Sequence, residues 1–67
     1  MIIYKIDVMK SLAAKGYIPS VIRKKGLFPE ATIQKFRKEK MVGIHSLDML
    51  CEILELQPGD IIEYVED

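Results

Sequence analysis

The chain has only one cysteine and one histidine among its 67 residues, and these low counts argue against two common ways of stabilising a small protein, a disulfide and a bound metal. The lone Cys51 cannot form an internal disulfide, and we expect it to be a small buried hydrophobe. His45 has no cysteine or histidine partners at metal-ligand spacing, so we expect a loop or helix-start residue and no metal site. No cofactor is predicted either. Folding must rest on a modest hydrophobic core, with self-association as the remaining support.

Long apolar runs are also missing. No stretch approaches the ~18 apolar residues that a membrane-spanning helix requires. The N-terminal sequence MIIYKID lacks the basic segment and the long apolar segment of a signal peptide. We therefore predict a cytoplasmic protein with no membrane contact.

The usual residue sets for catalysis are absent as well. The sequence has no nucleophile paired with a base, no carboxylate pair with a reason to share a cleft, and no glycine-rich phosphate loop. A domain of this size also has little room for a ligand pocket of typical volume. We predict that the protein is not an enzyme.

Positive charge is absent from the C-terminal part of the chain. Residues 41–67 carry seven carboxylates and no lysine or arginine, whereas residues 23–40 carry seven cations and two carboxylates. Such a division bears on partners rather than on fold. We expect the basic middle to face a polyanion. The acidic end would face away from it, where it could bind a basic protein partner.

Hydrophobic spacing and turn residues predict an all-α fold, a single domain over residues 1–67. Asp7 suits the start of a first helix, and Gly16 and Gly26 suit the ends of the first and second. Residues 2–5 could pair with Tyr64-Val65 in a small two-stranded terminal sheet. Four to five short helices are expected, at 7–15, 19–25, 29–38, from about Ser46 onward, and 58–62. The core-facing stripe of the fourth is Leu47, Leu50, Cys51 and Leu54.

The segment SVIRKKGLFPEATIQKFRK, residues 20–38, has the order helix, short glycine-containing turn, helix. This is the pattern of a helix-turn-helix, whose second helix enters the major groove of DNA. Ile33 and Phe36 indicate the buried side of that second helix, and Phe28 is expected to fill the space under the turn. Amides and cations can read base edges, and small side chains allow close approach. At about 3.6 residues per turn, the outward side carries Ala31, Gln34, Lys35 and Lys38.

The order of residues resembles the Cro/C1-type (XRE-like) helix-turn-helix family of bacterial and phage regulators, especially its small stand-alone members. The resemblance covers roughly residues 6–62. It rests on Leu12, Gly16-Tyr17, Ile22, Ala31-Thr32-Ile33 with Phe36, and the tail residues Leu47, Leu50, Cys51, Leu54, Leu56 and Ile61. The chain departs from the family pattern at Pro19, where Gln is usual, at Arg23, where a small residue is usual, and at Leu27 and Glu39, where glycine is usual.

The resemblance implies a lambda-repressor-like fold and a sequence-specific transcriptional regulator, expected to be a repressor, that reads the major groove of duplex DNA with residues 29–38. It also implies a homodimer. The charge division and their apolar residues make segments 2–4 and 61–65 candidate contact surfaces; we favour pairing of these two segments within one chain, with the dimer contact nearby. Base contacts would come from Glu30, Ala31, Gln34 and Lys35. Phosphate contacts would come from Ser20, Lys38 and Lys40, with Arg23 and Lys24 as further candidates.

One alternative stays open. A helix-turn-helix domain can serve as a protein-interaction module, such as the DNA-binding and docking part of an antitoxin, because fold does not settle function. Binding to duplex DNA that weakens steeply with salt would favour the regulator. A lack of duplex affinity together with a specific protein partner would favour the docking module.

Overall fold

The computed structural model describes residues 1–66 and has, over that range, five short helices and two strands. In chain order these are β1 (Ile2–Tyr4), α1 (Val8–Ala14), α2 (Pro19–Lys25), α3 (Glu30–Arg37), α4 (Ile44–Leu54), α5 (Pro58–Ile61) and β2 (Ile62–Tyr64). The two strands form one antiparallel sheet. The mainly helical fold with a small terminal sheet is therefore confirmed.

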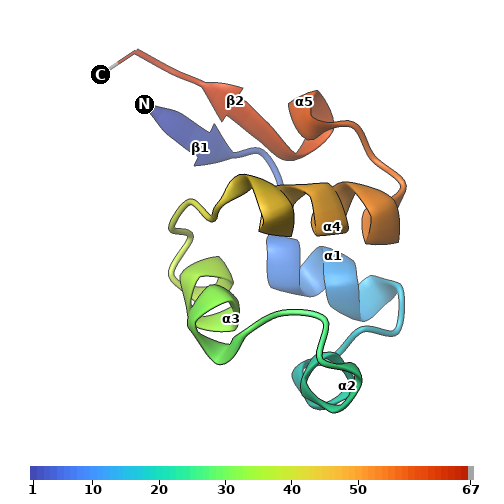
Figure 1. Cartoon of the computed structure of the whole chain (residues 1–67). Coiled ribbons are helices and arrows are strands. Elements are labelled where there is room, and N and C mark those ends of the chain that lie inside the picture. The colour runs from blue at the N-terminus through green and yellow to red at the C-terminus, as the bar shows by residue number, and fades with distance from the viewer. Residues whose placement is uncertain (67) are drawn as a thin grey trace.

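The two ends of the molecule are built from different elements. The sheet and α5 form one end, α1 and α4 lie in the middle, and α2 and α3 form the opposite end (Figure 1). α1 and α4 thus lie between most of α2 and α3 and the sheet, and only the C-terminal end of α3 comes near Tyr4 of β1. Most of the basic segment 23–40 is therefore on the side of the molecule away from β2 and α5.

The terminal sheet joins the two ends of the chain. Ile2 pairs with Tyr64 and Tyr4 pairs with Ile62, in antiparallel register. The backbone N–H of Val65 donates to the carbonyl of Met1 at 2.8 Å, just beyond the strand. The second strand was predicted at Tyr64-Val65, but it spans Ile62–Tyr64, because the chain passes from α5 directly into the sheet, and Val65 lies just beyond it.

Local signals in the sequence account for most helix boundaries. The Asp7 carboxylate accepts a hydrogen bond from the Lys10 N–H at 3.1 Å, which caps α1 as predicted. Gly16 and Gly26 follow α1 and α2 with φ of +89° and +63°, a left-handed conformation that glycine adopts without steric cost. Both predicted helix ends are confirmed.

The start of α4 differs from the prediction. The helix begins at Ile44, after Gly43 as N-cap, rather than at about Ser46. Ile44 belongs to the first turn but is 76% exposed. A start judged from the inward stripe, which begins at Leu47, therefore misses this turn.

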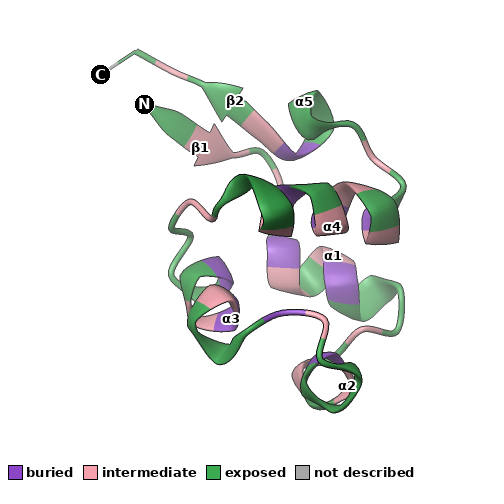
Figure 2. Ribbon diagram, viewed as in Figure 1, coloured by how far each residue is buried: buried purple, intermediate pink, exposed green. Residues whose placement is uncertain are grey.

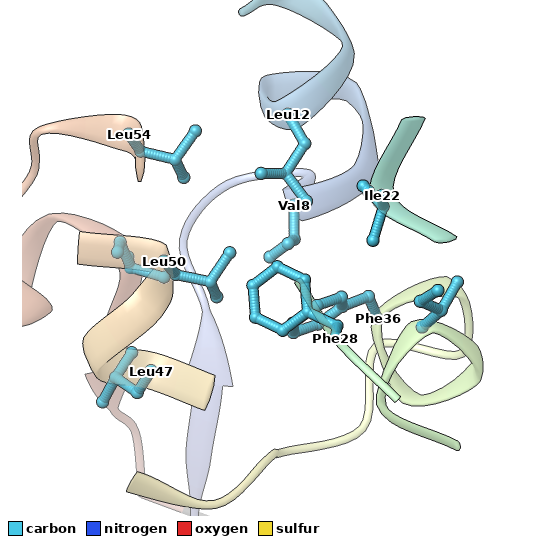
Figure 3. Close-up of a cluster of buried hydrophobic side chains, with 10 residues drawn as sticks. Val8, Leu12, Ile22, Phe28, Phe36, Leu47, Leu50 and Leu54 are labelled. Atoms are coloured by element: carbon cyan, nitrogen blue, oxygen red, sulfur yellow. The ribbon is translucent and has the colours of Figure 1, made fainter. Parts of the chain in front are cut away.

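The core joins all five helices and the turn between α2 and α3. The leucines of α4 point toward Val8, Leu12 and the two phenylalanines (Figure 3). Its buried residues are Val8, Leu12, Ile22, Phe28, Ile33, Phe36, Leu47, Leu50, Leu54 and Ile61. Burying such side chains contributes about 1.5–3 kcal/mol each to folding, so this cluster fixes how the helices lie.

Cys51 is half-buried rather than fully buried, so that part of the prediction is wrong. The inward direction of α4 is set by Leu47, Leu50 and Leu54, all buried. With about 100° of rotation per residue, Cys51 lies about 70° away from their mean direction. It therefore occupies the margin of the core.

None of the helices formed by residues 1–66 has the length and apolar character that crossing a lipid bilayer requires.

Candidate nucleic-acid interface

The α2–turn–α3 unit is held by apolar side chains from both helices and from the turn. Ile22 and Ile33 have no exposed surface. Phe28, in the turn, packs edge-on against Phe36 of α3 with ring centroids 5.1 Å apart, as expected for a residue that fills the space under the turn. This packing fixes the direction in which α3 presents its outer face.

The turn begins at Gly26, one residue before the position where the family pattern usually has glycine. The Gly26 N–H donates to the carbonyl of Arg23 at 3.2 Å, and the Leu27 N–H donates to that of Ile22 at 3.1 Å. These bonds close the end of α2. Leu27 is then free to turn partly inward against the core.

The outer face of α3 is exposed at the end of the molecule that α2 and α3 form (Figure 2). Ala31, Lys35 and Lys38 are exposed, and Lys38 is the C-cap residue. Gln34 is half-buried, whereas the helical spacing predicted a position on the exposed side. A small residue, an amide and two cations thus share one side of the helix.

Gln34 belongs to a chain of three polar side chains joined by hydrogen bonds. The Arg23 guanidinium of α2 donates from Nε to Glu30 Oε2 at 2.8 Å and from Nη2 to Glu30 Oε1 at 2.9 Å. Gln34 Nε2 donates to the same Oε1 at 3.3 Å. Three of the predicted contact residues, Arg23, Glu30 and Gln34, are therefore brought together directly.

The Glu30 carboxylate is strongly biased toward its ionised form. The pKa of Glu30 is lowered from its ordinary value of 4.5 to about 2, chiefly by the hydrogen bonds from Arg23 and to a smaller extent by the one from Gln34. The carboxylate is consequently a pure acceptor at neutral pH. Sequence reasoning missed this cluster, because Arg23 and Glu30 are seven residues apart across a turn rather than one helical turn apart.

The candidate phosphate contacts lie at two places around α3. Ser20 is exposed in the first turn of α2, and Lys24 is exposed near its end. Lys38 and Lys40 lie at the C-terminal end of α3, where the Lys40 carbonyl accepts a hydrogen bond from the Tyr4 hydroxyl at 2.8 Å. That bond attaches the backbone just after α3 to the side chain of Tyr4 in β1.

The residue after Lys38 adopts a conformation that favours glycine. Glu39 has a φ of +56°, and its N–H donates to the carbonyl of Phe36 at 3.2 Å. The next N–H, that of Lys40, donates to the carbonyl of Lys35 at 2.8 Å. The position at which the family pattern often has glycine is thus left-handed here, but a glutamate occupies it.

A groove runs along α4 and the start of α5, away from the helix-turn-helix. Its apolar lining includes Ile44, Leu47 and Cys51. Its acidic lining comprises Asp48, Glu52 and Glu55, of which Glu55 forms an exposed ion pair with Lys15 at 3.3 Å. This surface, here called the acidic groove, is distinct from the outer face of α3.

Comparison with known proteins agrees with the geometry of the helix-turn-helix. The family model of the Cro/C1-type HTH DNA-binding domain matches residues 8–67. The chain is 36% identical over 67 residues to an uncharacterized HTH-type transcriptional regulator, YozG, of Bacillus subtilis (strain 168), with 98% of this chain and 79% of that protein covered. No solved structure matches the chain at a significant level. The chain therefore belongs to the Cro/C1-type helix-turn-helix family of DNA-binding domains.

Proposed function

We propose that this protein is a sequence-specific transcriptional regulator that binds duplex DNA with α3 in the major groove. The observation that carries the proposal is the outer face of α3. Its half-exposed amide and exposed cationic side chains lie opposite the buried Ile33 and Phe36, at an end of the molecule that no other element of residues 1–66 covers. Repression is the simplest regulatory outcome, because a protein bound at a promoter can exclude polymerase without a further contact.

Base reading is assigned to the start and the centre of α3. Gln34 and Lys35 supply hydrogen-bonding groups for base edges, and Ala31 allows the helix to approach the groove closely. Glu30 lies at the start of the same helix, but its carboxylate already accepts bonds from Arg23 and Gln34. We therefore propose that Glu30 acts on base recognition through Gln34, as argued in the next subsection.

Phosphate binding is assigned to residues on both sides of that reading surface. Ser20 and Lys24 of α2 would contact one stretch of backbone, with Arg23 contributing charge beside them. Lys38 and Lys40 would contact another stretch; Lys38 lies about 12 Å along α3 from Glu30 at a rise of about 1.5 Å per residue, and Lys40 follows just beyond the helix. Such contacts supply affinity and register, whereas base contacts supply sequence preference.

A homodimer is proposed as the form that binds DNA. One short recognition helix makes few base contacts, and two copies on half-sites about one helical turn apart double them. The terminal sheet supports this proposal, because Ile2 and Tyr64 pair across the strands yet are 48% and 69% exposed. Exposed apolar residues of this kind suit a symmetric contact between two copies.

Selection of bound sequences from a random duplex pool tests the proposed function. Recovery of one preferred sequence, with affinity that falls as salt is raised, would support it. Equal affinity for all duplexes would contradict sequence-specific regulation, and a lack of duplex binding would contradict DNA binding.

A second candidate function is protein docking, and the acidic groove favours it. The groove combines apolar residues with three carboxylates, so the partner it fits is an amphipathic helix that carries lysine or arginine beside its apolar stripe. Titration with a designed cationic amphipathic peptide would measure this affinity. The matched variant Asp48→Lys/Glu52→Lys should lose it, while binding that is unchanged in the variant would exclude the groove as the site.

A further inference from the structure

We propose that Arg23 and Glu30 are positioning residues that orient the side-chain amide of Gln34 and thereby make this residue selective for adenine. The inference deepens the proposed function and rests on it. It starts from a continuous set of hydrogen bonds that runs from α2 to the middle of α3. Two bonds join Arg23 to Glu30, at 2.8 and 2.9 Å, and one joins Gln34 to Glu30, at 3.3 Å.

The first step concerns the geometry of the ion pair. Arg23 donates from Nε and Nη2 to the two different oxygens of Glu30, so the planar guanidinium holds the planar carboxylate in one orientation. A lysine at this position could not do so, because an ammonium lacks the fork of parallel donors. The carboxylate is therefore fixed relative to α2 as well as to its own helix.

The second step concerns the amide of Gln34. An ionised carboxylate only accepts hydrogen bonds, so the side of the amide that faces Glu30 must be its NH₂ group. The carbonyl oxygen of Gln34 then points away from Glu30. One N–H is used by Glu30, and the carbonyl oxygen and the second N–H remain available.

The third step matches these remaining groups to a base. The major-groove edge of adenine presents one acceptor, N7, and one donor, the N6 amino group. Guanine presents two acceptors, N7 and O6. An amide with one acceptor and a single spare N–H complements adenine and cannot donate separate bonds to both acceptors of guanine.

The fourth step separates positioning from stability. The Arg23 and Glu30 side chains are 46% and 55% exposed, and ion pairs of such exposure contribute little to folding because solvent screens them. Their bidentate geometry at the start of the proposed reading helix is thus better explained by an effect on the reading surface. Arg23 also brings a guanidinium to a position where the family pattern usually has a small side chain.

The test begins with the sequence that the wild-type protein selects. Affinities are then measured on four duplexes that differ only at the base pair whose preference is lost in Gln34→Ala. Wild-type protein should prefer adenine there by at least about tenfold, the usual effect of one bidentate contact. Glu30→Ala should reduce the preference to less than about twofold, and Arg23→Ala should reduce it to an intermediate value.

Controls distinguish positioning from a direct contact and from a general charge effect. The double variant Glu30→Ala/Gln34→Ala should have the same preference as Gln34→Ala alone, because both residues act through one contact. Glu30→Gln should restore part of the preference, since its carbonyl oxygen can still accept from Gln34. Glu39→Gln removes a carboxylate outside this set of bonds and should leave the preference unchanged.

Three outcomes would overturn the inference. One is an unchanged adenine preference in Glu30→Ala, and another is a loss at a different base pair from that affected by Gln34→Ala, which would make Glu30 a base contact itself. The third is a wild-type preference for a base other than adenine at the Gln34-dependent pair. None of these three outcomes would contradict the proposed function. If no sequence were selected at all, both the inference and the proposed function would be contradicted.

Discussion

Arg23 and Glu30 connect the two helices of the helix-turn-helix through two parallel hydrogen bonds, of 2.8 and 2.9 Å. The packing of Ile22, Phe28 and Phe36 already holds these helices together, so the pair adds a polar link on the outer side of the same unit. Glu30 of this pair also accepts a hydrogen bond from Gln34, so the link between the two helices reaches the surface proposed to read DNA.

The first prediction is that this ion pair makes stability depend on acid pH. Because the pKa of Glu30 is lowered from 4.5 to about 2, its stabilisation is fully present above about pH 4.5 and is lost as the pH falls toward 2. Because both side chains are about half exposed, wild-type protein should be only slightly more stable than Arg23→Gln at pH 6, and the difference should shrink as the pH falls from about 4.5 toward 2. Urea unfolding across this range measures it.

Lys24→Gln is the matched control, since it removes a neighbouring cation that does not bond Glu30. Its difference from wild type should vary much less with acid pH. Titration of the Glu30 carboxyl by NMR provides an independent check. A midpoint near 4.5 in the folded protein would show that the ion pair does not persist in solution.

The second prediction concerns Lys35, which is exposed on the outer face of α3. If it donates to a base edge, Lys35→Ala should cost about 1–3 kcal/mol on the preferred duplex and relax the preference at one base pair. Binding isotherms on the preferred duplex and on single-pair variants measure both effects. An equal loss of affinity on every duplex would instead assign Lys35 to a phosphate.

The third prediction concerns Lys38 and Lys40 at the end of α3. Each alanine variant should weaken binding on every sequence and lower the slope of log affinity against log salt by roughly one, because one phosphate contact is lost. Lys5→Ala is the control, as the Lys5 ammonium belongs to neither α2 nor α3 and donates to the Gly59 carbonyl of α5. A slope that stays at the wild-type value would remove either lysine from the interface.

The fourth prediction is that Glu39→Gly stabilises the protein. A left-handed conformation costs a residue with a side chain about 1–2 kcal/mol, and the greater entropy of unfolded glycine offsets about 0.5–1 kcal/mol of the gain. A net increase of about 0.5–1 kcal/mol in unfolding free energy is expected, with a melting temperature a few degrees higher. Thermal and urea unfolding measure this.

Glu39→Ala separates the backbone effect from the effect of charge. It removes the same carboxylate but keeps the Cβ atom that the positive φ disfavours, so it should give little or no gain. Equal stabilisation by both variants would mean that repulsion involving the Glu39 carboxylate, rather than backbone strain, limits stability.

The sequence predicted features that depend on short-range signals. The Asp7 cap, the left-handed glycines 16 and 26, and the buried faces of α3 and α4 all follow from spacing within one or two helical turns. The helix-turn-helix pattern followed from the same signals together with the family resemblance. These features could be predicted because each is decided largely by neighbours in the chain.

Features that depend on how helices meet could not be predicted in the same way. The Arg23–Glu30 pair requires the angle between α2 and α3, which the core sets, and no spacing rule gives it. Cys51 shares the helical stripe but lies at its margin, because the three leucines decide the inward direction of α4. Glu39 could be recognised as a departure from the family pattern, yet only the backbone shows that the glycine conformation is retained.

The last prediction is that the protein binds DNA as a homodimer through the terminal sheet. Ile2 and Tyr64 are opposite each other in the register, so their exposed side chains lie on one face of the sheet. Burying this face against a second copy would remove apolar surface from water on both protomers. The double variant Ile2→Lys/Tyr64→Lys should be monomeric, because like charges would meet across the two-fold axis.

Sedimentation of the free protein and of its complex with the selected duplex measures the stoichiometry. Wild-type protein should bind as two copies to a site with two-fold symmetry, and the double variant should bind a half-site with little change but lose affinity for the full site. Ile44→Lys is the control, since it charges another exposed apolar residue, on α4, outside the sheet. A single wild-type copy on a non-palindromic site would exclude the dimer. That result would still leave the proposed role of α3 intact, because base reading and dimerisation depend on opposite ends of the molecule.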